Sequence, residues 1–357
     1  MTRCASQSNC GSALGHGRAP SHSMTGSTTG AATRLNPSTV LVASALLLAA
    51  CGASPGALTS PSLASDGPET AAASQTPPPM ASAPSSVELG AAAWSTKYGF
   101  GGVWIQVDPP VDQMIKVDVA TGEIAMAIDG AIGVAFTDDG VWVAMPAQRE
   151  LRKLDPVSGE TLLTVPGGGA YLTSGAGSVW AVQGDGRILR VDPASGEKLA
   201  EIPIGDTELT DIAVDDDGAW VTAKEDGKVF RIDPATNEVV AEIETGAGAH
   251  GIVIDGSGVW VSNYRDNSVS RIDPATNEVV ATVDGVGSGA GITAGDGAIW
   301  VSTQGQGISR IDPGTNKATL VVERELTEWN YGIAFAAGEL WISSVDRELI
   351  YRVPISH

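Results

Sequence analysis

Residues 251–283 read GIVIDGSGVWVSNYRDNSVSRIDPATNEVVATV, and this unit recurs along the chain. Seven copies follow one another from about residue 90 to the end. Each copy carries a Trp after a Gly-rich turn, at Trp104, Trp142, Trp180, Trp220, Trp260, Trp300 and Trp341. The spacings between them are 38, 38, 40, 40, 40 and 41 residues. A period of this length is typical of proteins built from repeated blades.

Each unit contains four short runs rich in β-branched residues, which in the quoted copy are residues 252–254, 259–262, 268–272 and 278–283. Turn residues separate the runs. Gly256 and Gly258 suit a tight hairpin, and Asp273-Pro274 suits a turn in which Pro presets the backbone. Four short antiparallel strands in each of seven units predict an all-β, seven-bladed β-propeller.

The two ends of the repeat region predict how the ring closes. The last copy stops after its third strand, at residues 349–353, and lacks a fourth. Residues 86–89 precede the first copy, in the place that a fourth strand occupies elsewhere. We expect this N-terminal strand to complete the last blade, because closure removes an exposed sheet edge. We also expect the seven repeat Trp side chains to pack between blades rather than to form a ligand cage.

The N-terminal segment has the features of an export signal. Arg34 precedes an apolar run, residues 40–48, that is too short to span a bilayer but long enough for a signal peptide. The following Leu48-Ala49-Ala50-Cys51 resembles the lipobox of bacterial lipoproteins. This resemblance implies cleavage before Cys51 and attachment of a lipid to its thiol. An ordinary cleaved signal peptide is the alternative, and either Met1 or Met24 is the start.

Three regions follow from this reading. Residues 1–50 form a cleaved signal segment, and residues 51–86 form a lipidated Cys followed by a flexible Ala/Ser/Pro-rich tether. Such a tether has too few large apolar residues to offset its ordering entropy by burial. Residues 87–357 form the propeller. We therefore expect an extracytoplasmic monomer anchored to the membrane through Cys51, at the cell surface or on the periplasmic side.

The charge of the chain excludes one large class of partners. It has 42 acidic and 21 basic side chains and a net charge of −21. A phosphate backbone needs a basic footprint, so we expect no nucleic-acid binding. Electrostatic attraction to an anionic membrane surface is disfavoured for the same reason.

The repeat also resembles a known family. Residues 259–281 are similar to the YVTN-type propeller repeat, with Trp-Val-Ser-Asn at 260–263 in place of Tyr-Val-Thr-Asn. The whole domain is similar to the virginiamycin B lyase-like and NHL-like propellers, which implies the same seven-bladed fold. In lyases of this kind, His residues from propeller loops, with Glu and a magnesium ion, carry out an elimination. His250-Gly251 resembles one such motif, but no other repeat contains a His.

Alignment on the repeat Trp predicts where a site would lie. The positions ten residues before each Trp are Trp94, Ile132, Ala170, Thr210, His250, Ala290 and Tyr331, and the next positions are Ser95, Gly133, Tyr171, Asp211, Gly251, Gly291 and Gly332. Sevenfold equivalence places both sets around one channel mouth, together with nearby loops. The resulting ligand-binding candidates are Trp94, Tyr171, Thr210, Asp211, His250, Tyr264, Arg265, Trp329, Asn330 and Tyr331.

The sequence is compatible with three functions. The first is a binding protein that holds a protein, peptide or small ligand on the channel face. The second is a lyase-like or lactonase-like enzyme, with His250 as the candidate catalytic residue and Mg²⁺ or Ca²⁺ as its cofactor. The third is a structural envelope protein. Because the sequence shows no nucleophile elbow, zinc-ligand spacing or phosphate loop, we expect the binding protein.

Overall fold

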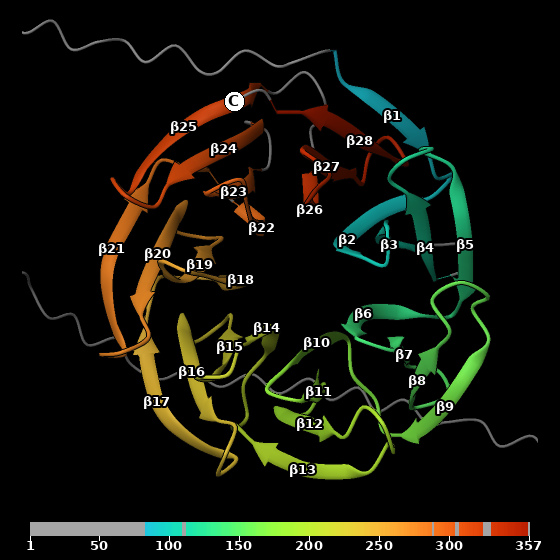
Figure 1. The fold of residues 1–357 in the computed structure, drawn as a ribbon. Helices are drawn as coiled ribbons and strands as arrows, with labels where there is room; N and C mark the ends of the chain where they lie inside the picture. Colours follow the sequence, from blue (N-terminus) through green and yellow to red (C-terminus); the bar gives the residue numbers. More distant parts are fainter. Residues whose placement is uncertain (1–82, 109–111, 288, 304–306, 324–329, 356–357) are drawn as a thin grey trace, which may run out of the picture. The chain divides into compact units, whose positions relative to one another are not determined.

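The computed structural model describes residues 83–108, 112–287, 289–303, 307–323 and 330–355. In these residues, strands β1 to β28 form seven antiparallel sheets of four strands each (Figure 1). The sheets are arranged in a ring, as the seven-bladed prediction requires, and residues from all seven line a central cavity. The described residues contain no helix long and apolar enough to cross a membrane. The predicted signal segment, Cys51 and most of the predicted tether lie outside the described residues.

Each blade has an inner, a second, a third and an outer strand. The inner strands are β2 (Ala92–Gly99), β6 (Ile132–Thr137), β10 (Tyr171–Gly175), β14 (Leu209–Val214), β18 (Ala249–Asp255), β22 (Gly289–Gly295) and β26 (Asn330–Ala336). The second strands are β3 (Gly102–Asp108), β7 (Gly140–Met145), β11 (Ser178–Val182), β15 (Ala219–Ala223), β19 (Gly258–Asn263), β23 (Ala298–Thr303) and β27 (Glu339–Ser344).

The remaining strands lie farther from the channel. The third strands are β4 (Gln113–Asp118), β8 (Glu150–Leu154), β12 (Arg187–Val191), β16 (Lys228–Asp233), β20 (Ser268–Asp273), β24 (Gly307–Asp312) and β28 (Leu349–Pro354). The outer strands are β5 (Ile124–Asp129), β9 (Thr161–Pro166), β13 (Lys198–Pro203), β17 (Glu238–Glu244), β21 (Glu278–Asp284), β25 (Lys317–Glu323) and β1 (Ser85–Glu88).

The predicted closure of the ring is confirmed. Strand β1 pairs antiparallel with β28, with Ser85 opposite Arg352 and Glu88 opposite Leu349. Leu89, which follows the strand, donates its backbone N–H to the carbonyl of Glu348 at 2.9 Å. The seventh blade is therefore built from both ends of the propeller, and its outer edge is supplied by the N-terminal strand.

The repeat Trp residues form the contacts between blades, as predicted. All seven are fully buried. Trp180 of the third blade, for example, packs against Ile212 and Val221 of the fourth. Burial of such large side chains at every blade junction supplies much of the hydrophobic stabilisation of the ring.

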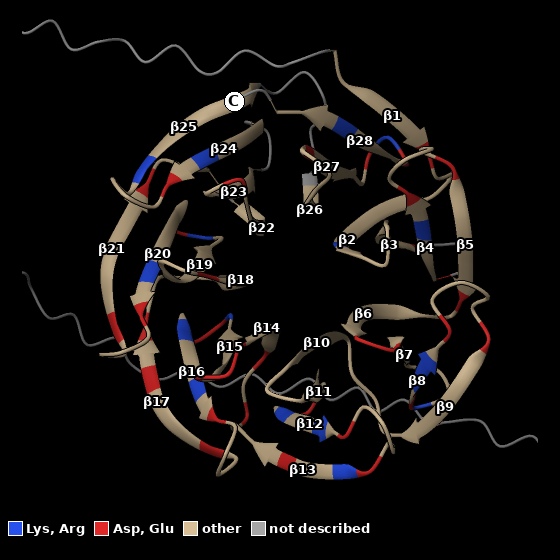
Figure 2. Cartoon of the chain, in the orientation of Figure 1, with Lys and Arg blue, Asp and Glu red and all other residues tan. Residues whose placement is uncertain are grey.

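In several blades, a basic side chain on the third strand forms hydrogen bonds with the next blade. Figure 2 shows such residues on β4, β12, β16, β20 and β28. The Arg231 guanidinium lies 4.8 Å from the Trp220 ring, and its Nη1 donates to the Pro274 carbonyl of the following blade at 2.8 Å. Arg352 of the last blade donates to the Val119 carbonyl of the first at 3.1 Å. The Asp-Pro turns of the repeat therefore serve as acceptors for the preceding blade.

Hydroxyl groups on the second strands hold the inner strands close together. Ser302 accepts a hydrogen bond from Gly291 N at 3.1 Å and donates to the Tyr331 carbonyl of the next blade at 3.0 Å. A Cβ at Gly291 would overlap that carbonyl. Gly291 is thus required by the close approach of the neighbouring inner strand.

Candidate functional site

The inner strands enclose a cavity of about 480 Å³ along the central channel. Five of the predicted ligand-binding residues line it, namely Tyr171, Thr210, Asp211, His250 and Tyr331. They come from the inner strands β10, β14, β18 and β26. The cavity also contains a residue that the sequence alignment did not select, Lys97 of β2.

The other candidates lie beside the cavity. Trp94 is not among its lining residues, although its ring packs edge-on against that of Tyr331, with 5.3 Å between the centroids. Tyr264 lies in the loop after β19, where its ring is 6.5 Å from that of His250. Arg265 turns to the surface and pairs with Glu225 at 2.6 Å. Trp329 lies outside the described residues, and of Asn330 only the backbone, at the start of β26, is described.

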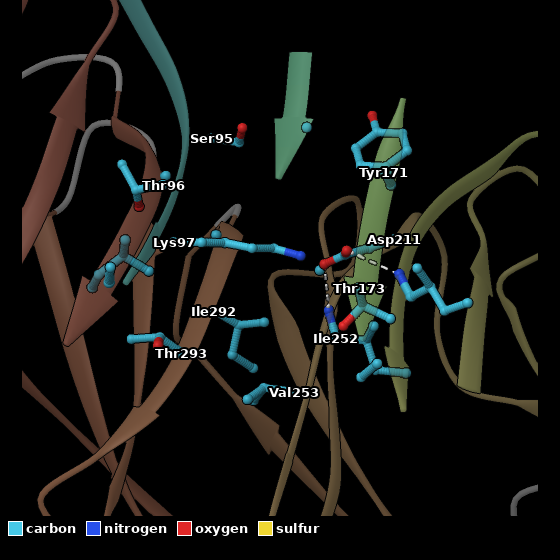
Figure 3. Close-up of a pocket in the computed structure, with 18 of the residues that line it drawn as sticks. Ser95, Thr96, Lys97, Tyr171, Thr173, Asp211, Ile252, Val253, Ile292 and Thr293 are labelled. Carbon is cyan, nitrogen blue, oxygen red and sulfur yellow. Dashed lines mark hydrogen bonds between the residues drawn. The ribbon is translucent and has the colours of Figure 1, made fainter. Parts of the chain in front are cut away.

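Lys97 reaches across the channel. Its side chain extends from β2 toward Asp211 (Figure 3), and its Nζ donates to the Leu172 carbonyl of the third blade at 2.5 Å. Burial lowers the pKa of Lys97, and the negative charge of Asp211 partly offsets this effect. The ammonium group therefore sits between blades that are not adjacent in the ring, inside the cavity.

Asp211 faces Lys97 from the fourth blade. Its Oδ1 accepts a hydrogen bond from Ile212 N at 2.9 Å, and its Oδ2 accepts one from Ile252 N at 3.2 Å (Figure 3). Burial raises the pKa of Asp211, while Lys97 and these two backbone bonds lower it. No ion pair joins these two described side chains, so their charges act on each other across the channel without direct contact.

His250 and Tyr331, which also line the cavity, form a hydrogen-bonded pair. The His250 Nε2 lies 2.7 Å from the Tyr331 hydroxyl, and the two rings meet edge-on. Burial, followed by the nearby charge of Lys224, lowers the pKa of His250 to about 4. Burial also raises the pKa of Tyr331 above its ordinary value. Near pH 7 the pair is therefore an uncharged imidazole bonded to an uncharged phenol.

Two further candidates have different roles in the cavity wall. Thr210 is 2 % exposed, and its hydroxyl bonds Thr222 Oγ1 at 3.1 Å and the Ala249 carbonyl at 3.2 Å. It therefore joins blades rather than offering a free polar group. Tyr171 is half-buried, and burial with the charges of Asp211 and Glu208 raises its pKa to about 12. Its phenol remains a neutral donor over the physiological pH range.

The donors in the channel do not suit Mg²⁺ or Ca²⁺. These ions take several oxygen ligands, whereas the cavity offers one carboxylate, that of Asp211, and a cation faces it. Among the described residues, no group of three or more His, Cys, Asp or Glu side chains is placed to hold a metal. Acidic side chains also occur in the turns before β7 and β15, but they have structural partners: Asp215 accepts a hydrogen bond from Gly218 N at 2.9 Å, and Asp139 pairs with Lys153 at 2.8 Å.

The low pKa of His250 predicts a pH-dependent stability. An unfolded His binds a proton below its ordinary pKa of 6.5, whereas the folded one does so only below about 4. The unfolded state thus binds more protons between these values, and stability falls as the pH decreases through this window. Relative to His250→Gln, which retains a hydrogen-bonding group for Tyr331, the wild-type protein should lose about 3 kcal/mol between pH 6.5 and pH 4. Urea unfolding of both proteins across this range measures the difference, and parallel curves would contradict the prediction.

The channel positions follow a simple register, which explains why Lys97 was missed. Residues seven positions before each Trp are Lys97, Ala135, Thr173, Ala213, Val253, Thr293 and Ala334. In a strand, residues two apart share a face, so this set lies one step below the ring that contains Asp211. The sequence alignment stopped at ten and nine residues before the Trp. Two residues further along the strand, it would have reached Lys97, the one charged residue of the set.

Comparisons with known proteins agree with the fold. The sequence profile of a family described as "Domain of unknown function (DUF5074)" matches residues 163–355. The β-propeller domain of Cps50 (Swd1) from Myceliophteria thermophila is 11% identical, with a TM-score of 0.64, and the match covers 78% of this chain and 100% of that one. The WD40 β-propeller domain of Doa1 is 12% identical, with a TM-score of 0.62, and the match covers 77% and 96%. No curated protein matches by sequence. At these identities the two structures establish the β-propeller architecture alone.

Proposed function

This chain belongs to the DUF5074 family, and we propose that it is an exported, membrane-anchored binding protein that holds a small ligand in its propeller channel. The β-propeller is a fold typical of binding scaffolds. The observation that carries the proposal is the cavity of about 480 Å³, into which Lys97, Asp211, Tyr171 and the His250–Tyr331 pair converge. Ligand sites are concave spaces of roughly 300–1,000 Å³ with a few converging polar groups.

The register of the last blade shows at which face of the ring the described chain enters the propeller. Glu88 pairs with Leu349, at the end of the blade where β26 begins with Asn330. Ser85 pairs with Arg352, toward the opposite end. The chain before Ser85 therefore joins the propeller at the face away from His250 and Tyr331.

A filled channel tests the binding function. Ser95 lines the cavity, and among the described residues its one side-chain bond is a long one, to Gln106 at 3.3 Å, so Ser95→Trp should place an indole ring in the cavity while the propeller still folds. After incubation with a small-molecule extract of the cell envelope, native mass spectrometry should show added mass on the wild-type protein and none on Ser95→Trp. Val157→Trp is the matched control, since Val157 is 87% exposed and far from the channel positions. Equal added mass on all three proteins would contradict a channel site.

The anchor is tested separately. Cys51→Ser removes the thiol that the lipobox-like segment presents, and the protein should move from the membrane fraction to the soluble fraction. Labelling with a radioactive fatty acid should be lost in the same variant. Retention of Cys51→Ser in washed membranes would argue for attachment through another segment.

An enzyme of the lyase or lactonase class is the alternative, because His250 and Tyr331 form a hydrogen-bonded pair inside the cavity. Three features favour binding over catalysis. Burial holds the pKa of His250 at about 4, which makes it a weak base at neutral pH. No second His lies among the repeats, and the channel donors do not suit a divalent cation. The likeness to virginiamycin B lyase-like propellers therefore contributes the architecture to this proposal rather than the chemistry.

A further inference from the structure

We infer that the channel binds a small zwitterion of the α-amino acid class, whose carboxylate contacts Lys97 and whose ammonium contacts Asp211. This inference rests on the proposed function and specifies the ligand of the same site. It starts from the two opposite charges that face each other across the cavity (Figure 3).

Both charged groups have unused hydrogen-bonding capacity. Lys97 Nζ carries three N–H donors, and among the described residues its one recorded acceptor is the Leu172 carbonyl. Each oxygen of Asp211 accepts one backbone N–H, although a carboxylate can accept about four bonds. A ligand can therefore bond to both groups without displacing a protein contact.

Because Lys97 and Asp211 are buried, pairing each of them with an opposite charge on a ligand is favourable. The surroundings of Lys97 and Asp211 disfavour each charged form, since burial is the largest influence on both pKa values. A buried charge is costly unless it is paired and hydrogen-bonded. A ligand anion and a ligand cation, each placed against its opposite, would satisfy both groups at once.

The same arrangement disfavours ligands with a single charge. An anion drawn to Lys97 would also lie near Asp211 and be repelled by it. A cation drawn to Asp211 would in turn lie near Lys97 and be repelled by it. A molecule that carries one charge of each sign can place each beside its opposite, so electrostatic complementarity favours a zwitterion.

The walls leave room for the rest of such a molecule. The neutral rings of Tyr171, His250 and Tyr331 provide apolar surface with polar tips. We therefore place the ligand side chain against these rings.

The test uses the detergent-solubilised full chain and isothermal titration calorimetry. The probes are the twenty common amino acids, with propionate, propylamine and glycerol as partial analogues. At least one amino acid should bind, and Lys97→Met and Asp211→Asn should each weaken its binding at least tenfold. Lys198→Met and Glu201→Gln are the matched controls, because this pair, 3.0 Å apart, is exposed near the outer strand β13. Circular dichroism and thermal unfolding verify that every variant is folded, and Lys97→Arg, which retains the cation, should bind more tightly than Lys97→Met.

Three results would overturn the inference. The first is that propionate, propylamine or glycerol binds as tightly as any amino acid, and the second is that amino-acid binding is unaffected by both charge removals. The third is that no amino acid binds while the wild-type protein still shows added mass that Ser95→Trp abolishes. That result would reject the zwitterion and retain the channel as a binding site. The absence of both signals would reject the proposed function as well.

Discussion

A chain that begins at residue 89 is expected to be less stable than one that begins at residue 83 by about 4 kcal/mol, with a Tm lower by about 10 °C. The shorter chain lacks β1, which pairs with β28 over four residues, Ser85 to Glu88. It also exposes part of the core that Val87 packs against. Thermal and urea unfolding of the two truncated proteins measure the difference.

The missing strand can be supplied in trans. A synthetic peptide of residues 83–90 should raise the Tm of the shorter protein, because it can occupy the open edge of β28. A peptide with the same composition in scrambled order is the control. If both truncated proteins unfold at the same temperature, the ring does not depend on the N-terminal strand for closure.

Trp260→Ala is expected to cost about 3–5 kcal/mol of unfolding free energy. The Trp260 side chain is fully buried between the fifth and sixth blades, where it packs against Ile299 and Val301. The Arg271 guanidinium lies 5.2 Å from the centre of the Trp260 ring, and the Trp260 Nε1–H donates to Asp255 Oδ1 at 3.0 Å. The substitution leaves a large cavity at a blade junction and removes these polar contacts together. Urea unfolding at neutral pH gives the magnitude.

The rim residue Trp94 provides the comparison for this experiment. It is half-buried at the channel mouth and packs on Tyr331 rather than in a blade junction. Trp94→Ala should therefore lose less than half as much stability as Trp260→Ala. Equal losses at the two positions would show that the repeat Trp is no more important to the fold than an aromatic residue at the rim.

Sequence reasoning predicted most of the architecture because the repeat carries its own register. A Trp at a fixed place in each unit, followed in five of the seven by an Asp-Pro turn, defines the second strand, the third strand and the turn at once. The missing fourth strand of the last copy identified β1 as its replacement. The membership in the DUF5074 family was not recognised from the sequence, and the lipobox-like segment at Cys51 remains a prediction.

The same register predicted part of the site. Five of the ten ligand-binding candidates line the cavity, since stepping back from the Trp follows the inner strand of each blade. Lys97 was missed because it lies two residues beyond Ser95, the last position of that strand included in the prediction. Arg265 was selected for its place in a loop, and only the structure shows that it pairs with Glu225 at the surface.

By itself, the sequence determined that seven similar units close into a ring and that their inner strands share one channel. This follows from local physics, because strand alternation, turn residues and a recurring large apolar side chain are all encoded within one repeat. Only the tertiary structure decided which non-repeated side chains meet. Lys97, Asp211 and His250 are far apart in the chain, and their blades are not all neighbours. Their convergence on one cavity depends on the closed ring, and burial there shifts their pKa values.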